Sequence, residues 1–391
     1  MRVAINVEQL FYRAPGGTGR YTARLAACIA AQFSGDVVLP FCAWHSRRQI
    51  GEVLARAGLG EPRLDRPVRF PLPRPFLFDS WHLGGSLAGR LLGPEAMSAR
   101  LRGADIVHMP FPVVPQMAKP LVVTVHDAGF ALYPEAYPPR GLRFHRRGLE
   151  MAAARAGLVI TDTRAAADEI LAHSAIRPDQ MRVVHLGVDH IGADPRRTDE
   201  VLHRYGLSGG PYALWVGSLE PRKNVGVLVK AFVKLAKANK VSARLAMVGP
   251  LGWLHEGLVA EADKALLGER LLVLGEVSDE ELRCLYAGAS SLAVPSLHEG
   301  FGFPVLEAMA QGTPVVCSDI AALAEVSGGA AILVPPPDVD RWATSLEEVL
   351  SDPALRARLA EAGRERAEQF SWEKMATGTH AVYEELLGMS T

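Results

Sequence analysis

One stretch of the chain decides its fold class: Ser296-Leu-His-Glu-Gly-Phe-Gly-Phe-Pro-Val-Leu-Glu-Ala-Met-Ala-Gln-Gly-Thr-Pro-Val-Val316. It follows Ser291–Pro295, a short apolar run that is typical of a buried parallel strand. Pro304 stands where the first turn of a helix is expected, because proline loses no hydrogen bond there. The stretch therefore predicts a strand, a glycine-containing turn and a helix, the unit from which parallel α/β sheets are built.

The turn within this stretch predicts an anion site. Gly300 and Gly302 let the backbone approach a ligand closely, and the amides and dipole of a helix N-terminus favour an anion such as a diphosphate. Glu299 and Glu307 lie eight positions apart beside this turn, and each carboxylate can accept hydrogen bonds from two vicinal hydroxyls. Either glutamate alone would be read as a solvated acid or a helix-start charge. Together they suggest one carboxylate on a ribose and the other on a sugar.

Similar apolar runs recur along the chain and alternate with amphipathic segments, which predicts two doubly wound α/β domains. We place the domains at residues 1–189 and 190–371, because the run from Gly187 to Pro195 favours neither strand nor helix. Two terminal helices are expected, at Pro353–Gln369 and from Trp372, with Ser371 as an N-cap. The expected strands are Val3–Val7, Val37–Ala43, Asp105–Met109, Leu121–Asp127, Leu158–Asp162 and Met181–Asp189, then Ala213–Leu219, Leu245–Gly249, Leu271–Val277, Ser291–Pro295, Pro314–Asp319 and Ala331–Pro335.

Charge is distributed unevenly over the 391 residues, although the net charge is only −1. The first 189 residues contain 23 Lys and Arg against 16 Asp and Glu, and the remainder contains 19 against 27. Chance scatter over exposed helices would explain this. The alternative is that the basic half meets an anionic acceptor or the negative face of a membrane. The segment from Pro62 to Pro75, with nearby aromatic residues, is expected to be a loop or an extended hairpin.

Composition and patterning exclude several classes of protein. No apolar run approaches the ~20 residues needed to cross a bilayer, and no signal-peptide pattern opens the chain, so we expect a cytoplasmic protein. The four cysteines stand far apart and suit neither a disulfide framework nor a zinc site. The histidines show no metal-ligand spacing, so no metal is expected.

A second motif, Val216-Gly-Ser-Leu-Glu-Pro-Arg-Lys-Asn224, follows the first strand of the second domain and opens a helix. Arg222 and Lys223 add positive charge where a helix N-terminus already favours anions. Such charge would stabilise a departing diphosphate more in the transition state than in the ground state. Two solvated surface cations are the alternative interpretation.

The first domain contributes two candidate motifs. His126 follows the strand from Leu121, where a neutral imidazole could hydrogen-bond a sugar hydroxyl, although a lone histidine there is more often structural. Pro15-Gly-Gly-Thr-Gly-Arg-Tyr21 precedes an expected helix at Tyr21–Gln32. It fails as a dinucleotide fingerprint, because the third glycine is missing and no acid stands about 20 positions on. The missing fingerprint argues against a nicotinamide-dependent dehydrogenase.

The string from Glu299 to Val316 resembles the signature of family 4 glycosyltransferases almost without a break. The resemblance implies a GT-B fold, in which two Rossmann-like domains hold a nucleotide-sugar in the cleft between them, and transfer with retention of anomeric configuration. It implies that Glu299 contacts hydroxyls of the donor sugar, that Glu307 holds the ribose, and that the amides around Phe301–Phe303 meet the sugar or the diphosphate. In this family no bound metal is usually needed. The resemblance also implies that a C-terminal helix, residues 372–391, crosses back onto the first domain.

The same resemblance assigns the other motifs. Glu-Pro-Arg-Lys-Asn is similar to the family's phosphate-binding turn, although Ser218 replaces an arginine that some members carry. The residues expected at the reaction centre are Glu299, His126, Arg222 and Lys223, with no protein base settled and the leaving phosphate as the favoured proton acceptor. Those expected to bind the donor are Gly16, Gly17, Arg222, Lys223, Glu299, Gly300, Phe301, Gly302, Phe303 and Glu307.

The residues from Leu214 to Asn224 look most like mannosyltransferases of polysaccharide and glycolipid assembly, which favours mannose from GDP-mannose. Donors based on UDP (glucose, galactose or N-acetylglucosamine) stay open, because base recognition relies on backbone around Gly275–Ser278. The acceptor is expected to be a glycan or a lipid-linked saccharide, with peripheral membrane contact open and no nucleic acid involved. The competing interpretations are a sugar-nucleotide epimerase or hydrolase of the same fold and a non-catalytic nucleotide-binding protein.

Overall fold

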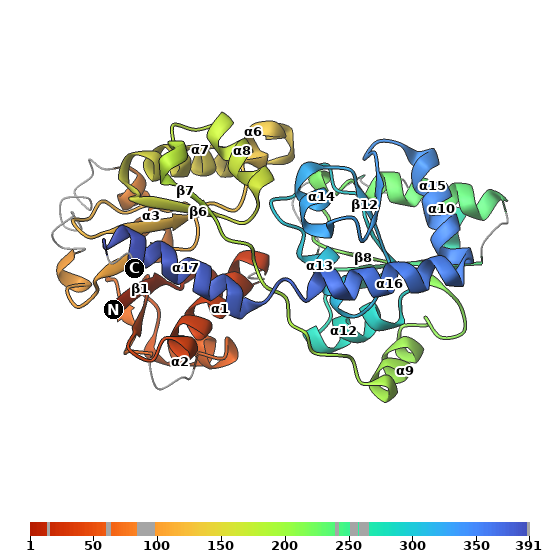
Figure 1. Ribbon diagram of the computed structural model, residues 1–391, viewed down its shortest axis with the longest axis horizontal. Helices are drawn as coiled ribbons and strands as arrows, with labels where there is room; N and C mark the ends of the chain where they lie inside the picture. Colours follow the sequence, from red (N-terminus) through yellow and green to blue (C-terminus); the bar gives the residue numbers. More distant parts are fainter. Residues whose placement is uncertain are drawn as a thin grey trace. The chain divides into compact units, whose positions relative to one another are not determined.

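The computed structural model describes residues 1–13, 16–59, 64–83, 98–238, 242–250, 257 and 266–388. It divides into two compact units. Unit 1 comprises Met1–Ala131, Pro139–Gly187 and Ser371–Thr391, and unit 2 comprises Leu132–Pro138 and Val188–Phe370. Each unit is built on one parallel sheet with helices on both faces (Figure 1).

The described residues of unit 1 form a seven-stranded sheet in the order β3-β2-β1-β4-β5-β6-β7. Helices α1 and α17 pack together on one face, and α3 and α7 lie on the other (Figure 1). The strands are β1 Arg2–Asn6, β2 Val37–Cys42, β3 Val68–Arg69, β4 Ile106–Met109, β5 Leu121–Thr124, β6 Leu158–Thr161 and β7 Met181–Val183. The helices are η1 Glu8–Phe11, α1 Gly16–Gln32, α2 Arg47–Arg56, α3 Arg74–Leu83, α6 Gly129–Leu132, α7 Pro139–Arg155, α8 Arg164–Ala172, η3 Pro178–Gln180 and α17 Trp372–Leu386.

The described residues of unit 2 form a six-stranded sheet in the order β10-β9-β8-β11-β12-β13. Its strands are β8 Tyr212–Val216, β9 Arg244–Val248, β10 Leu271–Gly275, β11 Ser291–Val294, β12 Val315–Ser318 and β13 Ile332–Val334. Its helices are η2 Pro134–Ala136, α9 Pro195–Arg204, η4 Pro221–Lys223, α10 Val225–Ala238, η5 Gly268–Arg270, α12 Asp279–Gly288, α13 Phe303–Ala310, α14 Ala321–Ser327, α15 Val339–Ser351 and α16 Pro353–Ala367.

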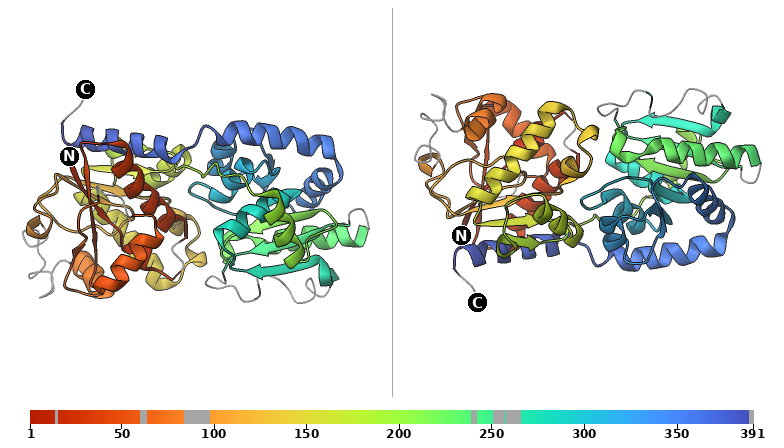
Figure 2. Two further views of the ribbon diagram at one scale, coloured as in Figure 1. Left: turned by 90° about the horizontal axis from the view of Figure 1, so that it is seen from below. Right: turned by 90° about the horizontal axis from the view of Figure 1, so that it is seen from above.

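The central strands of unit 2 are covered on both faces, which explains their continuous apolar sequences. Leu214 and Trp215 of β8 point to opposite faces, yet both are buried. Trp215 shares a core with Phe232 of α10 and Trp342 of α15. These two helices therefore cover one face of the sheet, while α12 and α13 cover the other (Figures 1 and 2).

The sequence predicted the six strands of unit 2 and six of those in unit 1, with ends that differ by a few residues. It missed β3. Val68 and Arg69 fall in the proline-rich segment that was expected to be a loop or a hairpin, and they instead pair in parallel with Phe41 and Cys42 of β2. A two-residue edge strand is too short to leave a periodic pattern, so this assignment was wrong for a physical reason.

The glycine-rich segment before Tyr21 also differs from its expectation. Gly16, Gly17 and Thr18 form the first turn of α1 rather than a loop ahead of the helix. Of these three residues, only Gly16 has a positive φ, of 60°. The buried face of α1, which includes Tyr21, stabilises the helix against the low helix propensity of glycine. Pro15 lies outside the described residues.

The chain ends in the two expected helices, α16 and α17. The Ser371 hydroxyl accepts a hydrogen bond from the Lys374 amide at 3.1 Å and caps α17, as predicted. A Cβ on Gly187 would lie 2.3 Å from the Trp372 nitrogen, so the backbone at the end of Val184–Gly187 runs directly against the start of α17. None of the described helices combines the length and the hydropathy that a membrane crossing requires.

Candidate functional site

The carboxyl ends of β8 and β11 carry two loops that are bonded together. Asn224 takes up a left-handed conformation, with φ of 51°, between η4 and α10. Its side-chain amide donates to the carbonyls of Pro295 at 3.1 Å and Pro336 at 2.9 Å. The Leu297 amide donates to the Arg222 carbonyl at 2.8 Å. The predicted phosphate-binding turn and the signature loop are thereby held side by side.

Four charged side chains meet between these loops: Glu220, Arg222, Lys223 and Glu299, which we call the charge cluster. Lys223 Nζ donates to Glu299 Oε1 at 2.7 Å, and Arg222 Nη1 lies 3.2 Å from Glu299 Oε2. The other terminal nitrogen of Arg222 donates to Glu220 at 2.8 Å. All four side chains are 14% exposed or less. Two cations and two carboxylates therefore balance each other in a largely buried site.

The local charges fix the ionisation of Glu299. Burial alone raises the pKa of this carboxyl, but Lys223 and then Arg222 outweigh burial and lower the pKa to about 2. The Ser296 hydroxyl adds a hydrogen bond of 2.7 Å to Oε1. For Glu220, burial dominates and the pKa is raised. Glu299 is therefore fully ionised at neutral pH.

Helix α13 starts beside the charge cluster with features that suit an anion. Its N-cap is Gly302, with φ of 104°, so no side chain caps the helix and glycine supplies the left-handed turn. Pro304 lies in the first turn, as predicted, and no acidic residue does. The dipole of this helix end is therefore not offset by a local carboxylate in its own first turn.

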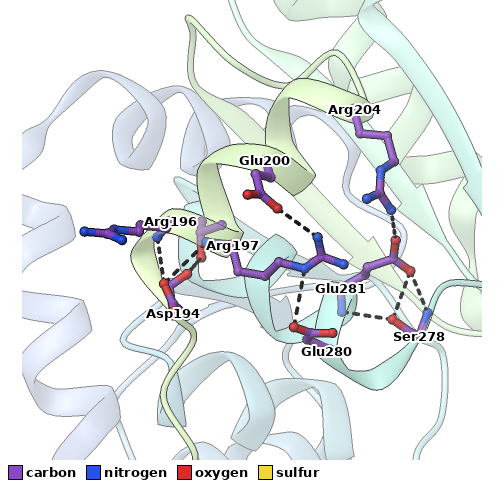
Figure 3. Close-up of polar contacts among 9 residues, drawn as sticks. Asp194, Arg196, Arg197, Glu200, Arg204, Ser278, Glu280 and Glu281 are labelled. Carbon is purple, nitrogen blue, oxygen red and sulfur yellow. Dashed lines mark hydrogen bonds and ion pairs between the residues drawn. The ribbon is translucent and has the colours of Figure 1, made fainter.

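Helix α12 offers a contrast at the same edge of the sheet. Ser278 and Glu281 form a capping box, in which the Ser278 amide donates to Glu281 at 3.0 Å and the Glu281 amide donates to Ser278 Oγ at 3.2 Å. Arg204 of α9 also pairs with Glu281, and Arg197 with Glu280 (Figure 3). The start of α12 is thus occupied by its own acids, which leaves α13 as the better anion site.

Glu307 lies in the second turn of α13 and is held by a neighbouring helix. Tyr286 of α12 donates its hydroxyl to Glu307 Oε2 at 2.8 Å. The Tyr286 carbonyl in turn accepts from Thr313 Oγ1 at 2.6 Å. The position of the Glu307 carboxylate is therefore set by the packing of α12 against α13.

His126 of unit 1 has both ring nitrogens bonded to protein. Nδ1 lies 2.7 Å from Asp162 Oδ2, and Nε2 lies 3.1 Å from the Pro110 carbonyl. A carbonyl oxygen only accepts, so Nε2 carries a proton, and Nδ1 shares a proton with the carboxylate. Burial lowers the pKa of His126, but Asp162 outweighs it, and the pKa is raised. The expected imidazole with a nitrogen available for a sugar hydroxyl is not found.

The structure brings together some of the predicted site residues. Arg222, Lys223 and Glu299 meet in the charge cluster, and Gly300, Phe301, Gly302, Phe303 and Glu307 continue from it into α13. Gly16 and Gly17 are exposed in the first turn of α1. Sequence reasoning missed four partners: Glu220, Ser296, Tyr286 and Asp162. Asp162 directly follows β6, the neighbour of β5, and this position was the available signal for its meeting with His126.

Two family models match successive parts of the chain. A family model described as "Glycosyltransferase Family 4" matches residues 15–190, and one described as "Glycosyl transferases group 1" matches residues 203–366. The "O-antigen chain mannosyltransferase B" of Escherichia coli is 30% identical over 387 residues, which covers 98% of this chain and 99% of that protein. The chain belongs to glycosyltransferase family 4.

Another relative of this glycosyltransferase is the "MMP alpha-(1->4)-mannosyltransferase" of Mycolicibacterium hassiacum, 37% identical over 59% of this chain and 54% of that protein. The fold matches that of the Anabaena Alr3699/HepE structure in complex with UDP and glucose, with a TM-score of 0.75, 17% identity and 98% of this chain covered. It also matches WaaG, a glycosyltransferase involved in lipopolysaccharide biosynthesis, with a TM-score of 0.67 and 19% identity over 97% of this chain. The glycosyltransferase thus has the GT-B fold.

Proposed function

We propose that this glycosyltransferase moves mannose from GDP-mannose to a hydroxyl of a glycan or lipid-linked acceptor, with retention of anomeric configuration. Two relatives with matches of 30% and 37% identity carry the name mannosyltransferase, and one of them matches along nearly the whole chain. The charge cluster next to the uncapped start of α13 is the observation that carries the proposal. It offers two cations and a helix dipole to a diphosphate within one site.

In this proposal the charge cluster exchanges partners when the donor binds. The diphosphate replaces Glu299 as the partner of Lys223 and Arg222, because its two phosphates together carry more charge than one carboxylate and accept hydrogen bonds at several oxygens. The released Glu299 carboxylate then accepts hydrogen bonds from hydroxyls of the transferred sugar. Glu220 keeps its hydrogen bond to Arg222 and orients the guanidinium.

Glu307 holds the ribose in this proposal. One carboxylate oxygen is fixed by Tyr286, which aligns the group for a pair of vicinal hydroxyls. The backbone around Phe301–Phe303 lies between Glu299 and Glu307 in the chain, at the start of α13, and we assign it to the diphosphate and the sugar. The donor would then lie along the carboxyl edge of the unit 2 sheet, where α/β sheets bind their ligands.

Charge that develops on the departing GDP is stabilised by Arg222 and Lys223. We assign no protein base, because the ring nitrogens of His126 are bonded to Asp162 and Pro110. The departing phosphate takes the proton of the acceptor hydroxyl. His126 then acts by holding the carboxyl ends of β5 and β6 together, and no metal is assigned a role.

Incubation of the purified protein with GDP-mannose, UDP-glucose, UDP-galactose and UDP-N-acetylglucosamine, each with α-mannobiose or a lipid extract, tests the proposal. We expect only GDP-mannose to be consumed in step with acceptor, and NMR of the product to show the anomeric configuration of the donor. Consumption without an acceptor would favour an epimerase or a hydrolase. Transfer from a UDP-sugar would favour the second candidate, which the complex of a structural neighbour with UDP and glucose supports.

A lipid-linked acceptor would bring the enzyme to the inner face of a membrane. The excess of Lys and Arg over Asp and Glu in residues 1–189 supports contact with an anionic surface. We propose a cytoplasmic enzyme with peripheral membrane contact. Co-sedimentation with anionic and with neutral vesicles tests this, and equal binding to both would contradict it.

A further inference from the structure

A short segment from the first half of the sequence belongs to unit 2. Leu132–Pro138 lies between α6 and α7, and the chain on either side of it, Met1–Ala131 and Pro139–Gly187, is part of unit 1. The polypeptide therefore leaves unit 1 and returns to it within a few residues. The contacts that this segment makes inside unit 2 show what the excursion achieves.

Tyr133 of this segment contacts the signature loop that follows β11 at two points. Its hydroxyl donates to the Leu297 carbonyl at 3.2 Å. Its ring centroid lies 6.1 Å from that of His298, with the two rings inclined at 50°. The backbone of Tyr133 is also fixed, because its carbonyl accepts from the Ala136 amide at 3.0 Å across η2. The half-buried Tyr133 ring is thus a defined contact of the loop.

Leu297 and His298 are the residues to which Arg222 is bonded. The Leu297 amide donates to the Arg222 carbonyl at 2.8 Å, and Arg222 Nη1 donates to the His298 carbonyl at 2.8 Å. Both the backbone and the guanidinium of Arg222 are therefore bonded to the dipeptide that Tyr133 contacts. His298 is only 4% exposed, so hydrogen bonds lost here are poorly replaced by water.

The same dipeptide connects two residues of the donor site. Ser296 Oγ donates to Glu299 Oε1 at 2.7 Å, and Leu297 and His298 lie between them in the chain. A displacement of the dipeptide would therefore move Arg222 and Glu299 at once. Small displacements of a group that stabilises developing charge are costly, because its interaction with the transition state depends on accurate placement.

We propose that Tyr133 is a positioning residue of the transfer reaction. It fixes Leu297 and His298, and through them it places the Arg222 guanidinium where charge develops on the departing diphosphate. Tyr133 itself does not contact the donor. The proposal rests on the proposed function, because it names the residue that orients Arg222 toward the leaving group. It also explains the course of the chain, since Leu132–Pro138 lies in unit 2 to support the signature loop.

Steady-state kinetics of mannosyl transfer from GDP-mannose to α-mannobiose tests the proposal. We expect Tyr133→Phe to lower kcat about fivefold, because one hydrogen bond between neutral groups is lost. Tyr133→Ala should lower kcat at least about twentyfold, because the ring contact is lost as well. The KM for GDP-mannose should change by less than about twofold, since Arg222 keeps its ion pair with Glu220. Tyr205→Phe is the matched control with unchanged kcat, because it also removes from unit 2 a bonded hydroxyl, that on Glu281.

NMR of the histidine side chains tests the contact without any substrate, so failure of this proposal is distinguishable from failure of the proposed function. The ring signals of His298, assigned with the variant His298→Asn, should shift in Tyr133→Ala and stay in place in Tyr205→Phe. Thermal unfolding confirms that each variant is folded. Transfer from a UDP-sugar would contradict the proposed donor but not this proposal, which predicts the same loss of kcat with that donor.

Each of three results would overturn the positioning role of Tyr133. The first is a wild-type kcat in Tyr133→Ala, even if its unfolding temperature falls, because Tyr133 would then contribute to stability alone. The second is a loss confined to KM, which would make Tyr133 a residue that binds the donor. The third is an unchanged set of His298 signals in Tyr133→Ala, which would show that the two rings do not meet.

Discussion

Replacement of Glu299 by glutamine tests the charge cluster most sharply. The substitution keeps the shape of the side chain and its bond to Ser296, but removes the charge that Lys223 and Arg222 face at 2.7 and 3.2 Å. Two largely buried cations would then share one carboxylate, that of Glu220. We expect a less stable protein that binds GDP more tightly, because the cations are released to the diphosphate.

The magnitude follows from the pKa of Glu299. A carboxyl with a pKa near 4.3 in the unfolded chain and about 2 in the folded protein contributes about 3 kcal/mol at neutral pH. Loss of one partner of a buried ion pair costs about 3–5 kcal/mol, which agrees. Because folding lowers this pKa, the contribution is complete above about pH 4.3 and disappears as the pH falls toward 2.

Urea unfolding of the wild type and Glu299→Gln at pH 7 and at pH 3 measures this contribution. We expect a difference of about 3 kcal/mol at pH 7 and a smaller one at pH 3. Calorimetry at pH 7 measures GDP affinity, which should rise in Glu299→Gln. The rate of mannosyl transfer should fall by at least about a hundredfold, because an interaction of roughly 3 kcal/mol with the transition state is lost. If Glu299→Gln were as stable as the wild type at pH 7 and bound GDP more weakly, Glu299 would not balance the charges of Lys223 and Arg222.

Three further changes follow from the same contacts. Glu307→Ala should weaken GDP-mannose binding about tenfold through loss of a charge-assisted hydrogen bond, with Tyr286→Phe as a milder variant, and unchanged calorimetric affinity would count against the ribose assignment. Gly249→Ala should destabilise the protein by at least about 3 kcal/mol, since its Cβ would lie 2.0 Å from the Gly217 carbonyl at φ of 134°, whereas Gly210→Ala has room and should change the urea midpoint little. Asp162→Asn should lower the pKa of His126 in an NMR titration, and an unchanged value would show that Asp162 does not set it.

Much of the fold could be predicted because its signals are local. Parallel strands covered on both faces give continuous apolar runs, and these located twelve of the thirteen strands of the described residues. Pro304 and Ser371 marked the starts of α13 and α17 correctly, since helix-start chemistry depends on one or two residues. The edge strand β3 was not predicted, because it forms by pairing with β2. The true start of α1 was not predicted either, because the helix is stabilised by packing of its buried face.

The candidate site could be predicted as a set of residues, but not as a set of contacts. Arg222, Lys223 and Glu299 were all expected to meet the donor. The ion pairs that Arg222 and Lys223 make with Glu299 join residues more than 70 positions apart, and they form because β8 and β11 are neighbours in the sheet. Likewise, His126 was found from its strand, whereas its partner Asp162 belongs to the next strand. Both contacts depend on which strands are neighbours in the sheet, and the spacing of residues along the sequence does not by itself give that order.

A crystal structure of the protein soaked with GDP tests the central claim most directly. The account predicts diphosphate oxygens within hydrogen-bonding distance of Arg222 and Lys223 at the start of α13, with Glu299 moved away from Lys223 and the ribose hydroxyls on Glu307. GDP bound elsewhere, with the Lys223–Glu299 ion pair of 2.7 Å intact, would contradict it.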